Sequence, residues 1–253
     1  MRQYKAYIFD LYGTLVDIHT DESKPGFWKK VAVFYGVHGA PYPPKQLRQD
    51  YLRLCAEETR RLTEDSGCTE QEVEIDLAPV FAGLYEAKGV QTSGALIADT
   101  AWFFRRASTT HLRAYAGARE LLQGLRAAGK QVLLLSNAQA LFTLPELEQL
   151  GLTDCFDAVY ISSSCGFRKP AKQLIRRLLE EQQLHPDVCL MLGNDPNSDL
   201  AVANSVQMDS FYLKSATSPE IDPNHADARY TQAPINLRTL KKDLLHNEKP
   251  AER

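Results

Sequence analysis

The sequence predicts an α/β fold, a doubly wound and mostly parallel sheet with a mainly helical block inserted after its first strand. Two observations carry this prediction. In the second half of the chain, short apolar runs typical of buried strands alternate with amphipathic helical segments. In the block before that half, hydrophobic residues recur at helical spacing with charged stretches between them. With 253 residues, 44% of them hydrophobic, the chain is long enough for one or two domains and a sizeable core.

The first strand is expected in the run Tyr7–Asp10, which is short, apolar and rich in residues that favour β structure. It ends in a carboxylate, and Gly13 follows it as a turn signal. From about residue 25 to residue 116 no alternating strand pattern is found, whereas Leu47, Tyr51 and Leu54 recur at helical spacing. We therefore expect this block to be a helical insert.

After Gly117 the pattern becomes one of alternating helices and strands. We expect helices over residues 118–128, 141–150, 171–182 and 200–206, and strands over residues 131–135, 158–161, 188–192, 210–213 and 228–231. Gly129 and Gly151 follow the first two of these helices, in the position where helices commonly end. Strands that alternate with helices of this length pair in parallel through right-handed crossovers.

Charge and composition exclude several classes of protein. The chain has 29 Lys and Arg residues against 32 Asp and Glu residues and no basic block, which is not the pattern of a general nucleic-acid-binding protein. Its apolar runs are far shorter than the ~20 residues of a membrane span, and no signal-peptide pattern precedes the first strand. The five cysteines and six histidines lack the spacings of a transition-metal site. We expect a cytoplasmic monomer or homodimer that acts on a small-molecule substrate, with no nucleic-acid or membrane partner.

Polar side chains follow the predicted strands at four places along the chain. Open α/β sheets bind ligands outside the carboxyl ends of their strands, so these side chains are expected at one rim of the sheet. Each of them alone is equally well explained as the cap of a turn or a helix. Taken together in chain order, they predict a functional site formed by Asp10; Ser136 and Asn137; Lys169; and Asp195 with Asp199.

The order and the residues of these four groups resemble the motifs of the haloacid dehalogenase superfamily. The matching segments are the run Asp10–Leu15, the apolar run ending in Ser136-Asn137, the pair Lys169-Pro170, and the loop Gly193–Asp199. The resemblance implies a Rossmann-like core formed by residues 1–15 and 116–253. Residues 16–115 would then form the helical cap that enzymes of this superfamily close over the core site.

The resemblance also assigns roles to the motif residues. Asp10 would be the nucleophile, which forms a covalent ester or acyl phosphate that water then cleaves. Ser136, the amide of Asn137 and Lys169 would hold the transferring oxygens, and Lys169 would also neutralise Asp10. Thr14 belongs to the same set of phosphate-binding residues. The expected catalytic residues are therefore Asp10, Ser136 and Lys169.

Attack of a carboxylate on a phosphate brings two anions together, and the hard oxygen ligands expected at this rim suit Mg²⁺. By resemblance, its ligands would be the Asp10 carboxylate, the backbone carbonyl of Tyr12 and one acidic residue of the fourth motif, for which we favour Asp195. Asp199 would either coordinate through water or orient the loop. Many relatives have Asp where this chain has Asn194, so the pairing could slip by one residue and turn Asn194 inward.

Tyr12 departs from the usual phosphatase pattern. Most phosphatase relatives have a second aspartate at this place, which protonates the leaving oxygen. Tyrosine, with an ordinary pKa near ~10, is a poor general acid at neutral pH. The 2-haloacid dehalogenases of the superfamily have tyrosine here, because a departing halide needs no proton. His19, a few residues further on, is a candidate replacement acid.

The fourth motif argues the other way. Dehalogenases use no metal, and without a cation the pair Asp195 and Asp199 would repel a haloacid carboxylate. Dehalogenases also need a cap arginine for the substrate, and the first arginine beyond the first motif is Arg48, in a charged helical run. These observations favour a Mg²⁺-dependent phosphatase or phosphotransferase. A metal-independent 2-haloacid dehalogenase and a non-catalytic ligand-binding module are the alternatives.

Overall fold

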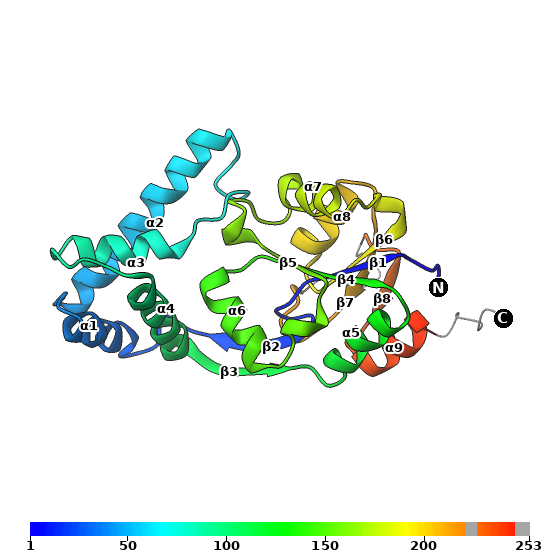
Figure 1. Ribbon diagram of the computed structural model, residues 1–253, viewed down its shortest axis with the longest axis horizontal. Coiled ribbons are helices and arrows are strands. Elements are labelled where there is room, and N and C mark those ends of the chain that lie inside the picture. Colours follow the sequence, from blue (N-terminus) through cyan, green and yellow to red (C-terminus); the bar gives the residue numbers. More distant parts are fainter. Residues whose placement is uncertain (221–226, 246–253) are drawn as a thin grey trace.

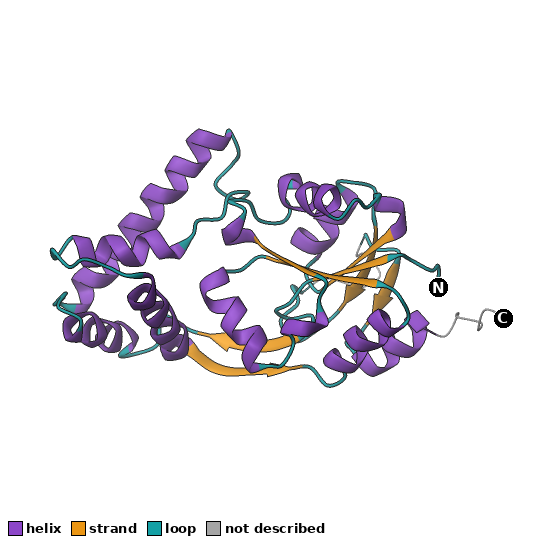
Figure 2. Ribbon diagram, in the orientation of Figure 1, coloured by secondary structure: helices purple, strands orange, loops and turns teal. Residues whose placement is uncertain are grey.

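The computed structural model describes residues 1–220 and 227–245. Its main feature is a six-stranded sheet in which all neighbouring strands run parallel, in the order β5-β4-β1-β6-β7-β8 (Figures 1 and 2). Helices cover both faces of the sheet, so the predicted doubly wound α/β core is confirmed. The strands are β1 (Ala6–Phe9), β4 (Gln131–Ser136), β5 (Ala158–Ile161), β6 (Cys189–Gly193), β7 (Asp209–Leu213) and β8 (Tyr230–Gln232).

β1 lies inside the sheet, and all four of its residues are buried, as expected for a parallel strand that is covered on both faces. It pairs with β4 on one side and with β6 on the other. The strand order therefore reverses beside β1, and Asp10 follows this strand directly. The carboxyl ends of the strands at such a reversal are where open α/β sheets bind ligands.

Alternate residues of the strands pack against helices on opposite faces of the sheet. Tyr7 and Phe9 belong to a hydrophobic core shared with α5, α6 and α9, whereas Ala6 and Ile8 belong to a second core shared with α7 and α8. The period of two along each strand thus gives the sheet two apolar faces. The helices of this part are α5 (Ala118–Ala127), α6 (Ala140–Gln149), α7 (Lys172–Glu181), α8 (Ala201–Asn204) and α9 (Leu237–Leu245).

A helical block and a two-stranded ribbon lie between β1 and α5 in the chain. The helices pack around a hydrophobic cluster of their own, which Phe142 of α6 joins. The antiparallel ribbon connects the block to the core, along the bottom of Figure 1. The elements are β2 (Val16–Thr20), α1 (Phe27–Val37), α2 (Pro44–Ser66), α3 (Leu77–Glu86), α4 (Gly94–Ser108) and β3 (Thr109–Ala114).

The segment between α2 and α3 makes a second connection, which we call the seam. In it, residues 72–74 lie against residues 166–168 of the loop that follows β5. An antiparallel bridge joins Val73 to Phe167, and two backbone hydrogen bonds of 3.0 and 2.9 Å flank it. The helical block is therefore fastened to the core at the seam as well as by the ribbon.

The structure differs from the prediction in three elements. β2 was not predicted, and β3 lies in the block that we expected to contain no strand; both strands are short, although residues 16–19 and 111–114 do alternate between polar and apolar residues. α9 was not predicted either, although Leu237, Leu240 and Leu244 form its buried face. The other predicted elements after residue 117 occur within a few residues of their expected positions. Among the described helices, none combines the length and the hydropathy of a transmembrane segment.

Candidate active site

Three neighbouring strands, β4, β1 and β6, end at the same rim of the sheet. The loops that follow them surround a pocket of about 370 Å³. The structure thus brings residues of all four motifs to one place, and Thr14 lies behind the pocket in contact with Asp10. The predicted site residues that line the pocket are Asp10, Tyr12, Ser136, Asn137, Lys169, Asp195 and Asp199.

Lys169 lies at the centre of this site, with only 1% of its side chain exposed. Its ammonium donates to Asp10 Oδ1 at 2.7 Å, to Asp199 Oδ1 at 2.6 Å and to the Leu135 carbonyl at 2.8 Å. An ammonium has three N–H donors, so all the donors of Lys169 are in use. Burial opposes its charged form, but the two carboxylates outweigh burial and raise the pKa of Lys169. Lys169 is therefore charged at neutral pH.

Asn137 fixes the backbone that carries Lys169. Its side-chain amide donates from Nδ2 to the Lys169 carbonyl at 2.9 Å and accepts at Oδ1 from the Lys169 N–H at 2.7 Å. The loop after β4 thereby holds the loop after β5 through two reciprocal hydrogen bonds. The Asn137 side chain thus helps to position Lys169, and since Asn137 also lines the pocket, its predicted part in holding the transferring oxygens stays a prediction.

The first-motif loop approaches the fourth motif closely. Thr14 Oγ1 lies 3.1 Å from Asp10 Oδ2, to which it donates, and 3.3 Å from Asn194 Oδ1. Gly13 adopts a φ of 86°, and a Cβ atom there would overlap the side chains of Asn194 and Thr217. Glycine is therefore required for both the turn and the close packing of the two loops.

In the fourth motif, Asn194 and Asp195 both line the pocket, and Asn194 is the more deeply buried of the two. It is 5% exposed, and its amide nitrogen lies 3.4 Å from the hydroxyls of Ser215 and Thr217. Asp195 is partly exposed at the pocket and accepts hydrogen bonds from the Asn197 N–H at 2.9 Å and from Ser198 Oγ at 3.0 Å. The Asp195 carboxylate thus caps η4 (Pro196–Leu200), a π-helical turn.

Asp199 is 1% exposed and supports Lys169 from behind. Its second oxygen accepts the Asp195 N–H at 3.0 Å. Burial raises the pKa of Asp199 and Lys169 opposes this, so the ionised carboxylate depends on its cation. A side chain at Gly193 would overlap the Asp199 carboxylate, which explains the glycine at the end of β6.

Ser136 differs from its neighbours because its hydroxyl has no partner in the part of the chain that the structure describes. The residue is 1% exposed, and its Oγ makes no hydrogen bond within the described residues. An unsatisfied buried hydroxyl costs about 1–3 kcal/mol. Since Ser136 lines the pocket, this hydroxyl is available to a ligand oxygen.

The ionisable groups that line the pocket carry one net negative charge. The carboxylates are those of Asp10, Asp195 and Asp199, and the cations are Arg168 and Lys169. Within the described residues, no three His, Cys, Asp or Glu side chains are gathered as a preformed metal site. Nevertheless, the carboxylates of Asp10 and Asp195 line one pocket that has excess negative charge, and their hard oxygen donors suit Mg²⁺.

The hydroxyl of Tyr12 is engaged by residues outside the four motifs, which makes it unsuitable as a general acid. Its hydroxyl donates to Glu146 Oε2 and lies 3.1 Å from Thr143 Oγ1, both on α6. Arg105, on α4, donates to Glu146 Oε1 at 2.6 Å. Burial and the neighbouring Glu146 raise the pKa of Tyr12 well above its usual value. Tyr12 therefore keeps its proton and links the first-motif loop to α6.

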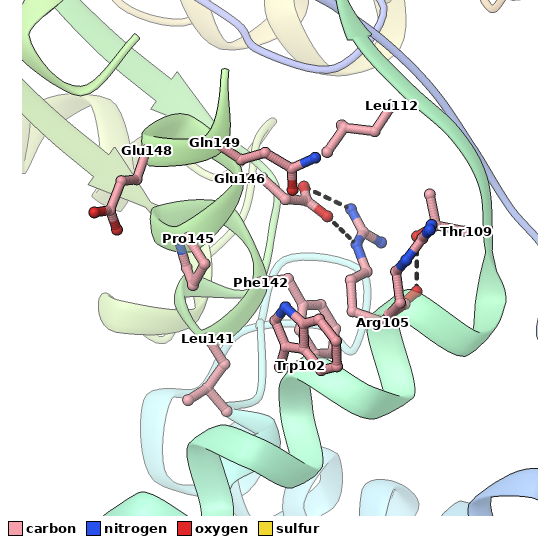
Figure 3. A pocket seen from close by; sticks show the side chains of 11 residues that line it. Trp102, Arg105, Thr109, Leu112, Leu141, Phe142, Pro145, Glu146, Glu148 and Gln149 are labelled. Carbon is pink, nitrogen blue, oxygen red and sulfur yellow. Dashed lines mark hydrogen bonds and ion pairs between the residues drawn. The ribbon is translucent and has the colours of Figure 1, made fainter. Parts of the chain in front are cut away.

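Figure 3 shows the Arg105–Glu146 pair at a second pocket, of about 500 Å³, between α4, β3 and α6. Trp102, Phe142 and Pro145 supply apolar surface there, and the four motifs contribute no lining residue. The larger of the two cavities is thus separate from the motif residues, and its charged pair is satisfied internally.

Two further residues considered from the sequence do not line the motif pocket. His19 lies on β2, where its Nδ1 is 2.9 Å from Thr110 Oγ1 and its ring stacks on His111. Arg48 is an exposed residue of α2. The candidate replacement acid and the candidate cap arginine therefore both lie outside the pocket.

Comparisons with known proteins agree with this geometry. The chain is 25% identical to the glyceraldehyde 3-phosphate phosphatase of Pyrococcus furiosus over 246 residues, which cover 96% of this chain and 95% of the relative. It is 30% identical to the phosphoglycolate phosphatase of Nitrosospira multiformis over 195 residues, 76% of each chain. A solved dehalogenase structure resembles it with a TM-score of 0.58 at 18% identity over 98% of this chain and 100% of that one, which shows the fold.

A family model described as haloacid dehalogenase-like hydrolase matches residues 4–207. This match spans all four motifs, from the strand before Asp10 to the loop that ends in Asp199, and it confirms the resemblance that the motifs predicted. The chain belongs to the haloacid dehalogenase-like hydrolases.

Proposed function

We propose that this hydrolase is a phosphatase or phosphotransferase that forms an aspartyl-phosphate on Asp10, with a small phosphorylated metabolite as substrate and Mg²⁺ as cofactor. One observation carries the proposal. Asp10 is hydrogen-bonded to the buried Lys169, and the unpartnered hydroxyl of Ser136 lines the same pocket. The two relatives named as phosphatases support it.

In the first step, a carboxylate oxygen of Asp10 attacks the phosphorus of the bound substrate. An oxygen–phosphorus bond forms, and the bond to the leaving oxygen breaks with its electron pair on that oxygen. Lys169 orients the attacking carboxylate, and the Ser136 hydroxyl donates to a phosphoryl oxygen. Water then attacks the acyl phosphate, releases inorganic phosphate and restores Asp10; an alcohol in its place would make the enzyme a phosphotransferase.

The residues assigned to hold Mg²⁺ are Asp10, the backbone carbonyl of Tyr12 and Asp195. When bound, the ion supplies the positive charge that offsets repulsion between the pocket carboxylates and a phosphate. The net negative charge of the residues that line the pocket supports this assignment. Asp199 is assigned to orient Lys169 and the loop 193–199, on the basis of its hydrogen bonds.

The nature of the leaving group follows from Tyr12. Its phenol is engaged by Glu146 and its pKa is raised, so it does not protonate a departing alkoxide. General acid catalysis contributes roughly 10²–10⁴-fold to such reactions. Hydrolysis should therefore favour acyl and aryl phosphates, whose leaving oxygens need no proton from the enzyme.

A metal-independent 2-haloacid dehalogenase is the second candidate, because Tyr12 matches the dehalogenase pattern. Its substrate would be a carboxylate, however, and the three carboxylates of the pocket disfavour such an anion in the absence of a metal. This function therefore ranks behind the phosphatase.

We also propose that residues 16–115 form a cap over a core made of residues 1–15 and 116–253. The separate hydrophobic cluster of α1–α4 supports this division. A cytoplasmic location and a monomeric or homodimeric state stay predictions.

The test is a turnover assay with p-nitrophenyl phosphate, acetyl phosphate and L-2-chloropropionate, each with and without EDTA. The expected result is phosphate release from the first two that is lost in EDTA and falls at least about 10³-fold in Asp10→Asn. Chloride release that persists in EDTA would identify a dehalogenase instead. Binding of phosphate esters without any Asp10-dependent release would identify a ligand-binding module.

A further inference from the structure

Two cationic side chains line the motif pocket, and among the described residues only one of them has hydrogen-bond partners for all of its donors. Lys169 uses all three of its donors on Asp10, Asp199 and Leu135. The neighbouring Arg168 lines the same pocket, and its guanidinium donates no hydrogen bond to any residue that the structure describes. Because a guanidinium has five N–H donors, Arg168 can donate charge-assisted hydrogen bonds to an anion that enters the pocket.

The backbone of Arg168 is fixed on both sides. Its N–H donates to the Glu72 carbonyl at 2.9 Å, as part of the seam, and its carbonyl accepts from the Ala171 N–H at 2.9 Å. The next residue, Lys169, is held by Asn137. The side chain thus extends from a fixed point at the edge of the pocket, while 44% of it stays exposed.

Glu74 lies close to the guanidinium without taking up its donors. Arg168 Nε is 3.7 Å from Glu74 Oε2, which is within an ion pair but beyond a hydrogen bond. The two oxygens of Glu74 accept instead from Ser162 Oγ at 3.1 Å and from Gln139 Nε2 at 3.2 Å. Glu74 therefore favours a guanidinium at this position and leaves its hydrogen-bonding fork open to a ligand.

We propose that Arg168 is a specificity-determining residue that binds a second anionic group of the substrate, a carboxylate or a second phosphate, while the transferred phosphoryl group lies at Asp10. The inference rests on the proposed phosphatase function and names its substrate class, small phosphate esters with a further negative charge. A guanidinium matches two oxygens of either anion through parallel hydrogen bonds, which an ammonium does not. A pocket of about 370 Å³ accommodates a ligand of this size.

The experiment compares aryl phosphates that differ in one charge, 3-carboxyphenyl phosphate and 3-carbamoylphenyl phosphate. The wild-type kcat/KM should be at least about tenfold higher for 3-carboxyphenyl phosphate than for 3-carbamoylphenyl phosphate, because the KM of the charged ester is lower. Arg168→Gln should bring this ratio close to one, and Arg168→Lys should give an intermediate ratio because it keeps charge but loses the fork. Resorcinol bisphosphate, compared with the same carbamoyl ester, tells whether the preferred second anion is a phosphate.

Arg176→Gln is the matched control, because Arg176 is an exposed arginine of α7 that does not line this pocket. It should keep the wild-type ratio. A wild-type ratio near one for both anions, or a ratio that survives Arg168→Gln, overturns the inference. An equal loss on charged and neutral esters in Arg168→Gln also overturns it, since Arg168 would then bind the transferred group.

The two proposals fail in distinguishable ways. If p-nitrophenyl phosphate is hydrolysed in an Asp10-dependent manner while the charge of the second group has no effect, the proposed function stands and the inference about Arg168 is wrong. If Asp10→Asn hydrolyses every ester as fast as the wild type, the proposed function is wrong and the inference falls with it.

Discussion

Two cations, the buried Lys169 and the partly buried Arg105, support the loop that follows β1, and they differ in what surrounds them. Lys169 lies between two carboxylates, those of Asp10 and Asp199, so this cluster carries one net negative charge. Arg105 faces the single carboxylate of Glu146, so that pair is neutral. Both clusters reach the same short loop, the first through Asp10 and the second through Tyr12.

The difference separates a reactive cluster from a structural one. Around Lys169, one negative charge is left over and the hydroxyl of Ser136 makes no hydrogen bond to any described residue, so the cluster has charge and hydrogen-bonding capacity left for a ligand. Around Arg105, the carboxylate of Glu146 is saturated by donors from Arg105 and Tyr12. A buried charge therefore indicates a functional site when it is unbalanced and lies next to a pocket, and a structural link when it is balanced.

Lys169→Met should have the largest effect. Removal of the ammonium leaves Asp10 and Asp199 buried without their cation, and breaking a buried ion pair in this way costs about 3–5 kcal/mol. Release of phosphate from p-nitrophenyl phosphate should fall by about 10³-fold. Urea unfolding and the phosphatase assay measure the two effects, and a variant with wild-type stability would remove the basis for placing Lys169 at the centre.

Ser136→Ala should separate turnover from stability. Turnover should fall by about 10²–10³-fold, because a donor to the transferring group is lost. The free energy of unfolding should not fall and should rise by up to about 1–3 kcal/mol, because the substitution removes a buried hydroxyl that makes no hydrogen bond within the described residues.

Ser162→Ala is the matched control for that variant. The Ser162 hydroxyl accepts from the Ala138 N–H at 2.8 Å and lies 3.1 Å from Glu74 Oε2, outside the residues that line the pocket. Its loss should cost about 1 kcal/mol of stability and change turnover little. If Ser162→Ala lowered turnover more than Ser136→Ala, the assignment of Ser136 to the substrate would be contradicted.

Arg105→Met should affect stability more than turnover. It leaves Glu146, which is 6% exposed, without its cation, and a hydrogen bond to a charged group is worth about 1.5–3 kcal/mol. Turnover should change by less than about tenfold, since the Lys169 cluster is untouched. The double variant Arg105→Met/Glu146→Gln should recover part of the lost free energy of unfolding in a double-mutant cycle. A fall in turnover of much more than about tenfold in Arg105→Met would show that the two clusters are not separate.

The smallest effect is expected in the pH dependence of stability at Glu74. Burial raises the pKa of this carboxyl above its ordinary value of 4.5. Between the unfolded and the folded pKa the native state binds more protons, so the free energy of unfolding should fall as the pH rises from about 4.5 and level off above the folded pKa. Glu74→Gln should show a smaller decline than the wild type in urea unfolding from pH 4 to 8, because the contribution of Glu74 is removed while that of Asp199, whose pKa burial also raises, remains.

The motif residues could be predicted because each of them is tied to the end of an apolar strand. Asp10 and Ser136 directly follow buried runs whose parallel pairing places their ends at one rim. The choice between Asn194 and Asp195 could not be predicted in the same way. Both residues lie between the end of β6 and the π-helical turn that begins at Pro196, and such a short connection has no periodic pattern from which side-chain directions follow.

The residues that hold Tyr12 were missed for a different reason. Glu146 lies on the buried face of α6 with Phe142 and Leu147, and a carboxylate on an apolar face is a signal of a buried partner. That partner could not be identified, because Arg105 lies 41 residues earlier, in the inserted block, and only the docking of α4 on α6 brings the two together. The seam escaped prediction likewise, since it is formed by backbone groups.

The seam ties the α2–α3 connection to the edge of the motif pocket where Arg168 lies. Residues 72–74 are hydrogen-bonded to the segment that carries Arg168, so a shorter or longer connection would act first on that arginine, whereas Asp10, Ser136 and Asp199 belong to other segments of the core. An insertion or deletion in this one surface loop is therefore expected to alter ligand preference more than reaction chemistry.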